Sequence, residues 1–258
     1  MKQDSGVFPF DLSRAELHWL AGAFGIASLP LPPSGDAPSG LSPSQMEARQ
    51  KNGHASLLTR GLIRPSPGFG WQVERLPAAL LQWISSAPSL LRLERIPKDG
   101  AAQRIHLFTA GDQGLSLEMD DDTARFVIFQ TRRLLQESAV RWLALPAGAK
   151  KSTTAHDLPQ PITFLPTTWK DSQLASRILK EQGMNTKTAK STLAWAVSLE
   201  WVTALSKVKL EGQRNVVANQ FVLCGNAKSI WGGRDERTKV SFVHIAEKTI
   251  NATIGEML

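Results

Sequence analysis

The feature that most constrains the fold of this chain is a change in hydrophobic period, which occurs twice along the sequence. Up to about residue 86 apolar residues recur at helical spacing, as Leu17, Leu20 and Phe24 do. From residue 90 they alternate with polar neighbours, as Ile105 and Leu107 do, and this period of two indicates strands. Because the change recurs near residue 201, the sequence predicts an α+β fold in which helices precede strands twice.

The first half is predicted to contain helices, then a meander of short strands, then one closing helix. Ser13, with Glu16 three residues later, is typical of a helix N-terminus, and so is Ser42 followed by Pro43. Turn-forming residues separate the strands. The expected helices cover residues 13–24, 43–60 and 76–86, the strands 90–96, 104–109, 115–119 and 124–129, and the closing helix 131–145.

The second half follows the same order. Its expected helices cover 170–181 and 186–200, its strands 202–210, 216–223, 228–232 and 239–245, and its closing helix 246–257. At a shift of 116 residues, Ile105 and Leu107 coincide with Phe221 and Leu223. We therefore predict two quasi-repeated halves, each with helices, a four-stranded antiparallel meander and a closing helix. A chance similarity of two meanders is the alternative. The expected domains are residues 1–146 and 164–258, joined by a linker at 147–163.

Composition favours a globular cytoplasmic protein. Of the 258 residues, 42% are hydrophobic, which is enough for an ordinary packed core. The apolar stretches fall short of the roughly 20 residues that cross a bilayer, and the first ten residues do not resemble a secretory signal. Cys224 is the single cysteine, so an internal disulfide is excluded, and its apolar neighbours predict a packing role.

The sequence shows no pattern that is typical of catalysis or cofactor binding. No two histidines have metal-ligand spacing, and neither a phosphate-binding glycine loop nor a Gly-x-Ser-x-Gly elbow is found. We therefore expect a protein that is not an enzyme and that binds no cofactor and no metal. The five histidines are His18, His54, His106, His156 and His244.

Tryptophan is the unusual aromatic choice of this chain, with eight tryptophans and no tyrosine. Most of them fall on apolar faces of expected elements and are interpreted as core residues. Trp71 and Trp231 lie at the ends of elements, where such a ring can anchor a protein partner.

Several segments together resemble the EspG family. These are Ala15-Glu16-Leu17 followed by a proline-rich loop, the phrase Leu57-Leu58-Thr59-Arg60-Gly61-Leu62-Ile63 at the end of a helix, and the two meanders with closing helices. The resemblance covers nearly the whole chain, in pattern more than in identity. It implies a mixed helix and antiparallel-sheet fold with quasi-twofold related halves. It also implies a cytosolic, chaperone-like role in type VII secretion, in which PE–PPE substrate heterodimers are bound and kept soluble. Abundant lysine and tryptophan set this chain apart from typical members.

A protein of this kind covers an exposed apolar tip of its client, using sheet loops and flanking helices as a clamp. The loops at 98–103 and 211–215 occupy equivalent places in the two halves and are the expected contact sites. The alternative is that they are simple hairpin connections. The candidate partner-binding residues are Lys98, Asp99, Gln103, Glu211, Gln213, Arg214, Asn215 and Trp231.

A winged-helix nucleic-acid-binding protein is the second hypothesis. Two expected helices separated by a short turn precede a basic hairpin, as in a helix-turn-helix with a wing. Residues 147–258 hold 15 basic against 9 acidic side chains and so carry six of the chain's seven net positive charges. Few Arg, Asn or Gln side chains lie where a recognition helix reads bases. The candidate nucleic-acid-binding residues are Lys187, Lys190, Lys207, Lys209 and Arg214.

Overall fold

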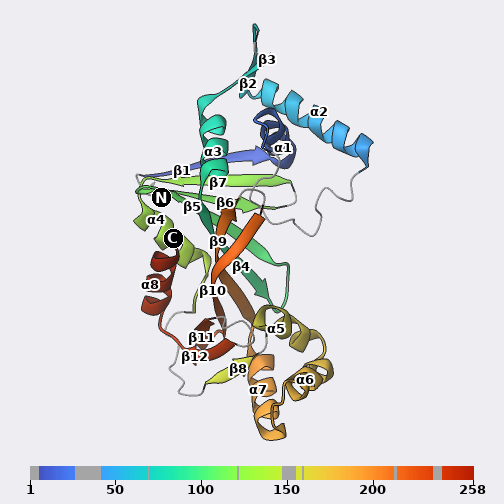
Figure 1. Cartoon of the computed structure of the whole chain (residues 1–258), viewed down its shortest axis with the longest axis vertical. Helices are drawn as coiled ribbons and strands as arrows, with labels where there is room; N and C mark the ends of the chain where they lie inside the picture. The colour runs from blue at the N-terminus through green and yellow to red at the C-terminus, as the bar shows by residue number, and fades with distance from the viewer. Residues whose placement is uncertain are drawn as a thin grey trace. The chain divides into compact units, whose positions relative to one another are not determined.

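The computed structural model describes residues 6–26, 42–68, 70–120, 122–146, 155–158, 160–211, 214–234 and 240–258. Figure 1 labels the helices and strands of these segments in chain order. As far as residue 142 they are β1 (Val7–Ser13), α1 (Arg14–Ala23), α2 (Pro43–Thr59), β2 (Ile63–Ser66), β3 (Gly70–Val73), α3 (Arg75–Ser86), β4 (Ser89–Pro97), β5 (Gln103–Ala110), β6 (Gln113–Met119), β7 (Thr123–Phe129) and α4 (Arg132–Trp142). Beyond that residue they are β8 (His156–Leu158), α5 (Pro161–Lys170), α6 (Ser172–Glu181), α7 (Thr186–Ser198), β9 (Trp201–Glu211), β10 (Arg214–Asn226), β11 (Ser229–Arg234), β12 (Val240–His244) and α8 (Glu247–Met257).

Ten of the described strands form one sheet in the order β1-β7-β6-β5-β4-β9-β10-β11-β12-β8, and β2 and β3 form a separate hairpin. Strand β1 pairs antiparallel with β7, so that Phe10 lies opposite Phe126. The pairings of β6 with β7, and of β10, β11, β12 and β8 in turn, are antiparallel as well. Helices and an antiparallel sheet that alternate in blocks along the chain define the α+β class. The predicted fold class is therefore confirmed.

The chain divides into two compact units. Unit 1 comprises Met1–Leu90, His106–Arg132 and Lys209–Val216, and unit 2 comprises Leu91–Ile105, Arg133–Val208 and Val217–Leu258. Strands β4, β5, β9 and β10 contribute residues to both units. Within unit 1, α1 packs against α2. Within unit 2, α5, α6 and α7 pack against one another as a group of three helices (Figure 1).

The order of elements is similar in the two halves of the sequence. Among the described elements, β1, α1, α2, β2, β3 and α3 precede the first meander, whereas β8, α5, α6 and α7 precede the second, so the halves differ by the β2–β3 hairpin. One helix, α4 or α8, follows each meander. Similar order does not establish equal geometry, so the structural equivalence of the halves stays a prediction. The proposed domain boundaries at 146 and 164 stay a prediction too.

Four segments that the sequence did not identify are regular in the structure. Strand β1 contains Pro9, which an edge strand tolerates because one row of its N–H groups has no ladder partner. The turn-rich stretch after α2 forms the hairpin of β2 and β3. Residues expected to be linker hold β8 and the start of α5, and the helix expected from residue 170 begins at Ser172. Helix α5 contains Pro166 in its interior, which disfavours a helix, and it is held by burial of Phe164 and Leu165.

The N-terminus of α1 is a capping box, as predicted from Ser13 and Glu16. The Ser13 hydroxyl accepts a hydrogen bond from the Glu16 N–H at 3.1 Å, and the Glu16 carboxylate accepts one from the Ser13 N–H at 2.7 Å. The predicted N-cap Ser42 of α2 is confirmed in the same way, with Pro43 in the first turn. Local sequence therefore determines where both helices begin.

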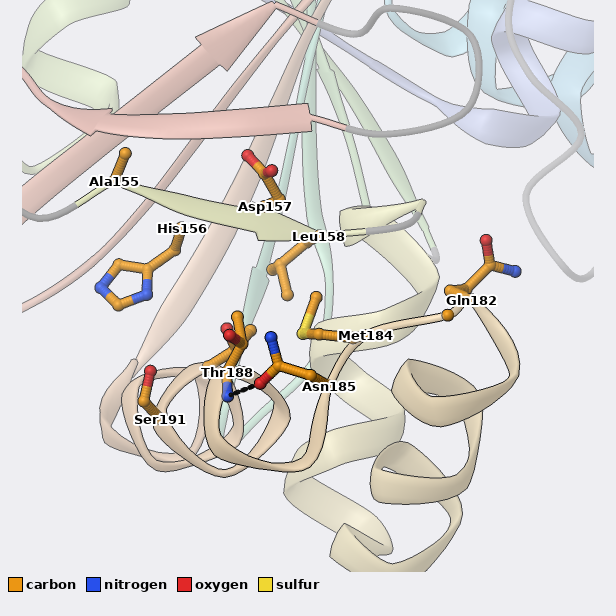
Figure 2. Close-up of a pocket in the computed structure, with 11 residues that line it drawn as sticks. Ala155, His156, Asp157, Leu158, Gln182, Met184, Asn185, Thr188 and Ser191 are labelled. Carbon is orange, nitrogen blue, oxygen red and sulfur yellow. Dashed lines mark hydrogen bonds between the residues drawn. The ribbon is translucent and has the colours of Figure 1, made fainter.

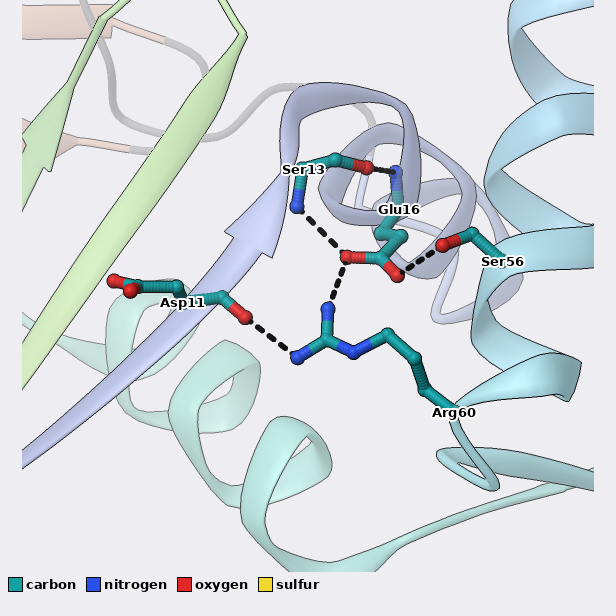
Figure 3. A network of polar contacts seen from close by, with 5 residues as sticks. All are labelled: Asp11, Ser13, Glu16, Ser56 and Arg60. Carbon is teal, nitrogen blue, oxygen red and sulfur yellow. Dashed lines mark hydrogen bonds and ion pairs between the residues drawn. The ribbon is translucent and has the colours of Figure 1, made fainter.

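The Glu16 carboxylate also joins α1 to α2 through a polar network that the sequence did not predict (Figure 3). Ser56 and Arg60 of the α2 end donate to its two oxygens at 2.7 and 2.6 Å, and Arg60 also donates to the Asp11 carbonyl oxygen at 2.9 Å. Burial by itself raises the pKa of Glu16, but the hydrogen bonds from Ser56, Ser13 and Arg60 outweigh it and hold the pKa below its usual value. Glu16 is therefore a buried anion, and both of its carboxylate oxygens accept hydrogen bonds from neighbouring groups.

A hydrophobic cluster fills unit 2 between the three-helix group and the sheet. Trp195, Trp231 and Phe242 lie in it, together with Cys224, whose thiol is fully buried. Burial raises the pKa of the Cys224 thiol well above its usual value, which fits the predicted packing role. Among the described helices, none combines the length and the hydrophobicity that crossing a bilayer requires.

Candidate functional site

The first predicted contact loop connects β4 to β5 in unit 2. Its first residue, Lys98, is anchored, because the backbone N–H donates to the Glu200 carbonyl oxygen at 2.6 Å and the ammonium donates to the Val197 carbonyl oxygen at 3.1 Å. Asp99 and Gln103 are exposed. The loop thus presents polar side chains from a base that is fixed to the end of α7.

The second predicted contact loop connects β9 to β10 in unit 1. Gln213 lies outside the described residues, and so do the side chains of Glu211, Arg214 and Asn215. The strand residues that follow are exposed and apolar, since Val216 and Val217 keep 43% and 48% of their surface. Sequence reasoning did not single out these valines, whose side chains point to opposite faces of β10 because they are consecutive strand residues.

Trp231 lies in the core of unit 2 and not on its surface. Only 6% of it is exposed, and its ring packs edge-on against Trp195 with centroids 5.5 Å apart. Such burial leaves little of the ring for a partner to contact. Trp71, the other tryptophan singled out, is 39% exposed and lies edge-on against His54, with centroids 4.5 Å apart. Trp71 therefore fits a partner anchor better than Trp231 does.

The lysines of the nucleic-acid hypothesis are distributed over one helix and one strand. Lys187 and Lys190 are exposed on α7, Lys209 is exposed on β9, and Lys207 is half-buried. Arg214 belongs to β10. Strands β9 and β10 are interior members of the sheet, each with a neighbour on both sides, whereas a wing is a hairpin at an edge. This placement argues against a wing, and the nucleic-acid hypothesis stays an untested alternative.

The structure adds a pocket that sequence reasoning missed. It has a volume of about 420 Å³ and lies in unit 2, between β8 and the turn from α6 to α7 (Figure 2). It is lined by Ala155, His156, Asp157, Leu158, Gln182, Gly183, Met184, Asn185, Thr188, Ser191 and Thr192. The two lining segments are more than twenty residues apart in sequence, so no local motif marks the pocket.

Side chains at the rim of the pocket are held in place by their neighbours. The His156 ring stacks on Trp195, with centroids 4.2 Å apart and planes 6° from parallel. Asp157 accepts a hydrogen bond from the Ser241 hydroxyl at 2.5 Å, and Asn185 caps α7 by accepting the Thr188 N–H at 2.9 Å. Burial lowers the pKa of His156, and the nearby Asp157 carboxylate opposes this effect, so the imidazole is neutral near pH 7.

The pocket offers hydrogen-bonding groups of several kinds. Within the described ranges, no three His, Cys, Asp or Glu side chains gather closely enough to hold a metal ion. Hydroxyl, carboxamide and imidazole groups line the pocket, together with one carboxylate. Such a lining is suited to recognising neutral polar groups.

The fold and these surfaces define an α+β protein built on one large sheet, with exposed loops and apolar residues beside it. No family model matches the sequence, and no curated protein matches it. Among solved structures, the chain is similar to the Mycobacterium tuberculosis type VII secretion system chaperone EspG5, which was determined in complex with the PE25–PPE41 dimer. The TM-score is 0.57 and the identity 9%, over 96% of this chain and 95% of that chain. The predicted resemblance to the EspG family is therefore confirmed at the level of the fold.

Proposed function

We propose that this chain is a cytosolic, non-enzymatic protein-binding factor that works as a chaperone for a small helical client, by covering an apolar tip of that client. One observation carries the proposal: the fold matches, over nearly the whole length of both chains, that of a secretion chaperone whose structure contains a bound protein dimer. A shared fold does not fix a shared function, so the function must also fit the exposed surfaces of this chain.

The exposed surface beside the second contact loop supports this function. Val216 and Val217 of β10 are apolar and exposed. The side chains of the loop at 211–215, which come just before them in the sequence, are polar. Because successive side chains of a strand point to opposite faces, each of these valines offers one exposed apolar side chain next to the polar loop residues. Exposed apolar side chains with polar neighbours are common in protein interfaces. Covering an apolar tip in this way removes it from water and prevents aggregation, and no covalent chemistry is needed.

The test of this function is to express the chain together with a small helical heterodimer. The heterodimer is of the PE–PPE type and comes from the same organism as the chain. We expect the soluble fraction of the heterodimer to rise when the chain is present, and the three proteins to elute together in size-exclusion chromatography. The reason is that the client's apolar tip is covered in the complex. A heterodimer that stays equally insoluble with and without the chain would contradict the proposal.

A pair of matched variants tests which surface is used. Val217→Glu places a charge beside the second contact loop and is expected to weaken the complex by about tenfold or more. Val243→Glu is the control, because Val243 is also an exposed strand valine, at 51%, but belongs to β12, which is separated from β10 by β11 in the sheet order. Equal effects of the two changes would remove the loop from the proposed contact surface.

A further inference from the structure

The pocket beside β8 runs along the edge of a strand. Four consecutive residues, 155–158, line it. The last three of these residues form β8. Among the described strands, β8 ends the sheet and pairs only with β12. Figure 2 shows β8 between β12 and the first turns of α7.

The helix side of the pocket presents hydroxyls that lack partners. Thr188, Ser191 and Thr192 have the spacing that places them on one face of α7, and all three line the pocket. Their side chains make no hydrogen bond with a residue that the structure describes. Thr192 is only 2% exposed. A ligand that enters the pocket can form hydrogen bonds with these hydroxyls and gains affinity from them.

The lining also indicates the chemistry of the ligand. Its free groups are neutral donors and acceptors, it contains no lysine or arginine, and it includes the Asp157 carboxylate, which disfavours an anion. A peptide backbone matches this set, since each residue carries one donor and one acceptor. Strand β8 is three residues long, which corresponds to a segment of roughly 10 Å.

We infer that the edge of β8 and its pocket bind an extended peptide segment of a protein partner, which joins the sheet as an added strand beside β8. The backbone of the segment pairs with β8, and its side chains and remaining amide groups meet Thr188, Ser191 and Thr192 in the pocket. The inference rests on the proposed protein-binding function and specifies one mode of contact for it.

The test uses the full chain and a random library of twelve-residue peptides displayed on phage, from which binders are selected and synthesised. We expect a selected peptide to slow amide hydrogen exchange in residues 155–158 and to lose affinity by about tenfold or more in Ser191→Trp, which fills the pocket. Ser191 is exposed, so this change is compatible with folding, and circular dichroism checks it. Ala194→Trp is the matched control, because Ala194 is exposed on the same helix but does not line the pocket.

Three results would overturn the inference: no peptide that binds the purified chain, a peptide that binds Ser191→Trp as tightly as the parent, or protection from exchange elsewhere in the chain only. The proposed function is judged separately. If the helical heterodimer still forms its complex with the chain while the peptide experiment fails, the added strand is wrong and the chaperone function stands.

Discussion

At the scale of single residues, the buried carboxylate of Glu16 holds two helices together. Its side chain is 1% exposed, whereas its ion-pair partner Arg60 is 40% exposed. Arg60 therefore keeps access to water if the pair is broken, while Ser56 and the Ser13 N–H lose their acceptor. The stabilisation at this site depends on the charge of one carboxylate.

Glu16→Gln is expected to lower the free energy of unfolding by about 1–3 kcal/mol at neutral pH. The pKa of Glu16 is held below its usual value in the folded state, so its contribution is fully present above the unfolded pKa of about 4.3 and is lost as the pH falls through the folded pKa. The difference between parent and variant should therefore shrink in acid. Urea unfolding at neutral pH and at about pH 3 measures it.

Glu137→Gln is the control for this change. Glu137 pairs with Arg133 on an exposed face of α4, with side chains 40% and 86% exposed. Its removal should cost no more than about 0.5 kcal/mol. A loss for Glu16→Gln that is the same at both pH values would show that the carboxylate charge is not responsible.

At the scale of elements, a glycine sets the distance between α1 and α2. A Cβ atom added at Gly53 of α2 would collide with the carbonyl oxygen of Ala15 at the start of α1. The obstacle is backbone and not a flexible side chain, so the two helices would have to move apart. In contrast, a Cβ atom at Gly22 of α1 meets nothing within 4 Å.

Gly53→Ala is expected to destabilise the protein by about 1–3 kcal/mol through overpacking, although alanine is the better helix former. Gly22→Ala, the matched change on the partner helix, should stabilise it by about 0.5–1 kcal/mol because only the helix propensity changes. Thermal unfolding of both variants measures the difference. A Gly53→Ala protein as stable as the parent would mean that α1 and α2 are not in close contact.

The elements also show how far sequence reasoning extends. The helix starts at Ser13 and Ser42 follow from side-chain capping, a local effect that the sequence displays. Helix α5 does not follow, because Pro166 removes a backbone hydrogen bond inside the helix, and burial of Phe164 and Leu165, a tertiary effect, is what favours it. Strand β8 is too short for any period to be visible. The pocket beside it depends on both segments and could not be predicted.

At the scale of the whole molecule, the two functional hypotheses predict different responses to salt. The net charge of +7 permits attraction to nucleic acid, but the interior position of β9 and β10 argues against a wing. We therefore expect no measurable binding of a labelled random DNA duplex at physiological salt, with fluorescence anisotropy as the measurement. A tight complex that is lost between low and moderate salt, and that Lys187→Glu with Lys190→Glu weakens further, would favour the nucleic-acid hypothesis instead.

The sequence alone determined the class of fold, the order of most elements and the two helix caps, because hydrophobic period and capping act between residues close in the chain. Tertiary structure decided the rest. It placed Trp231 in the core, brought Glu16 to Ser56 and Arg60, and made a short strand at 156–158 the edge of a ten-stranded sheet. These outcomes depend on contacts between residues far apart in the chain, whose energies local spacing does not contain.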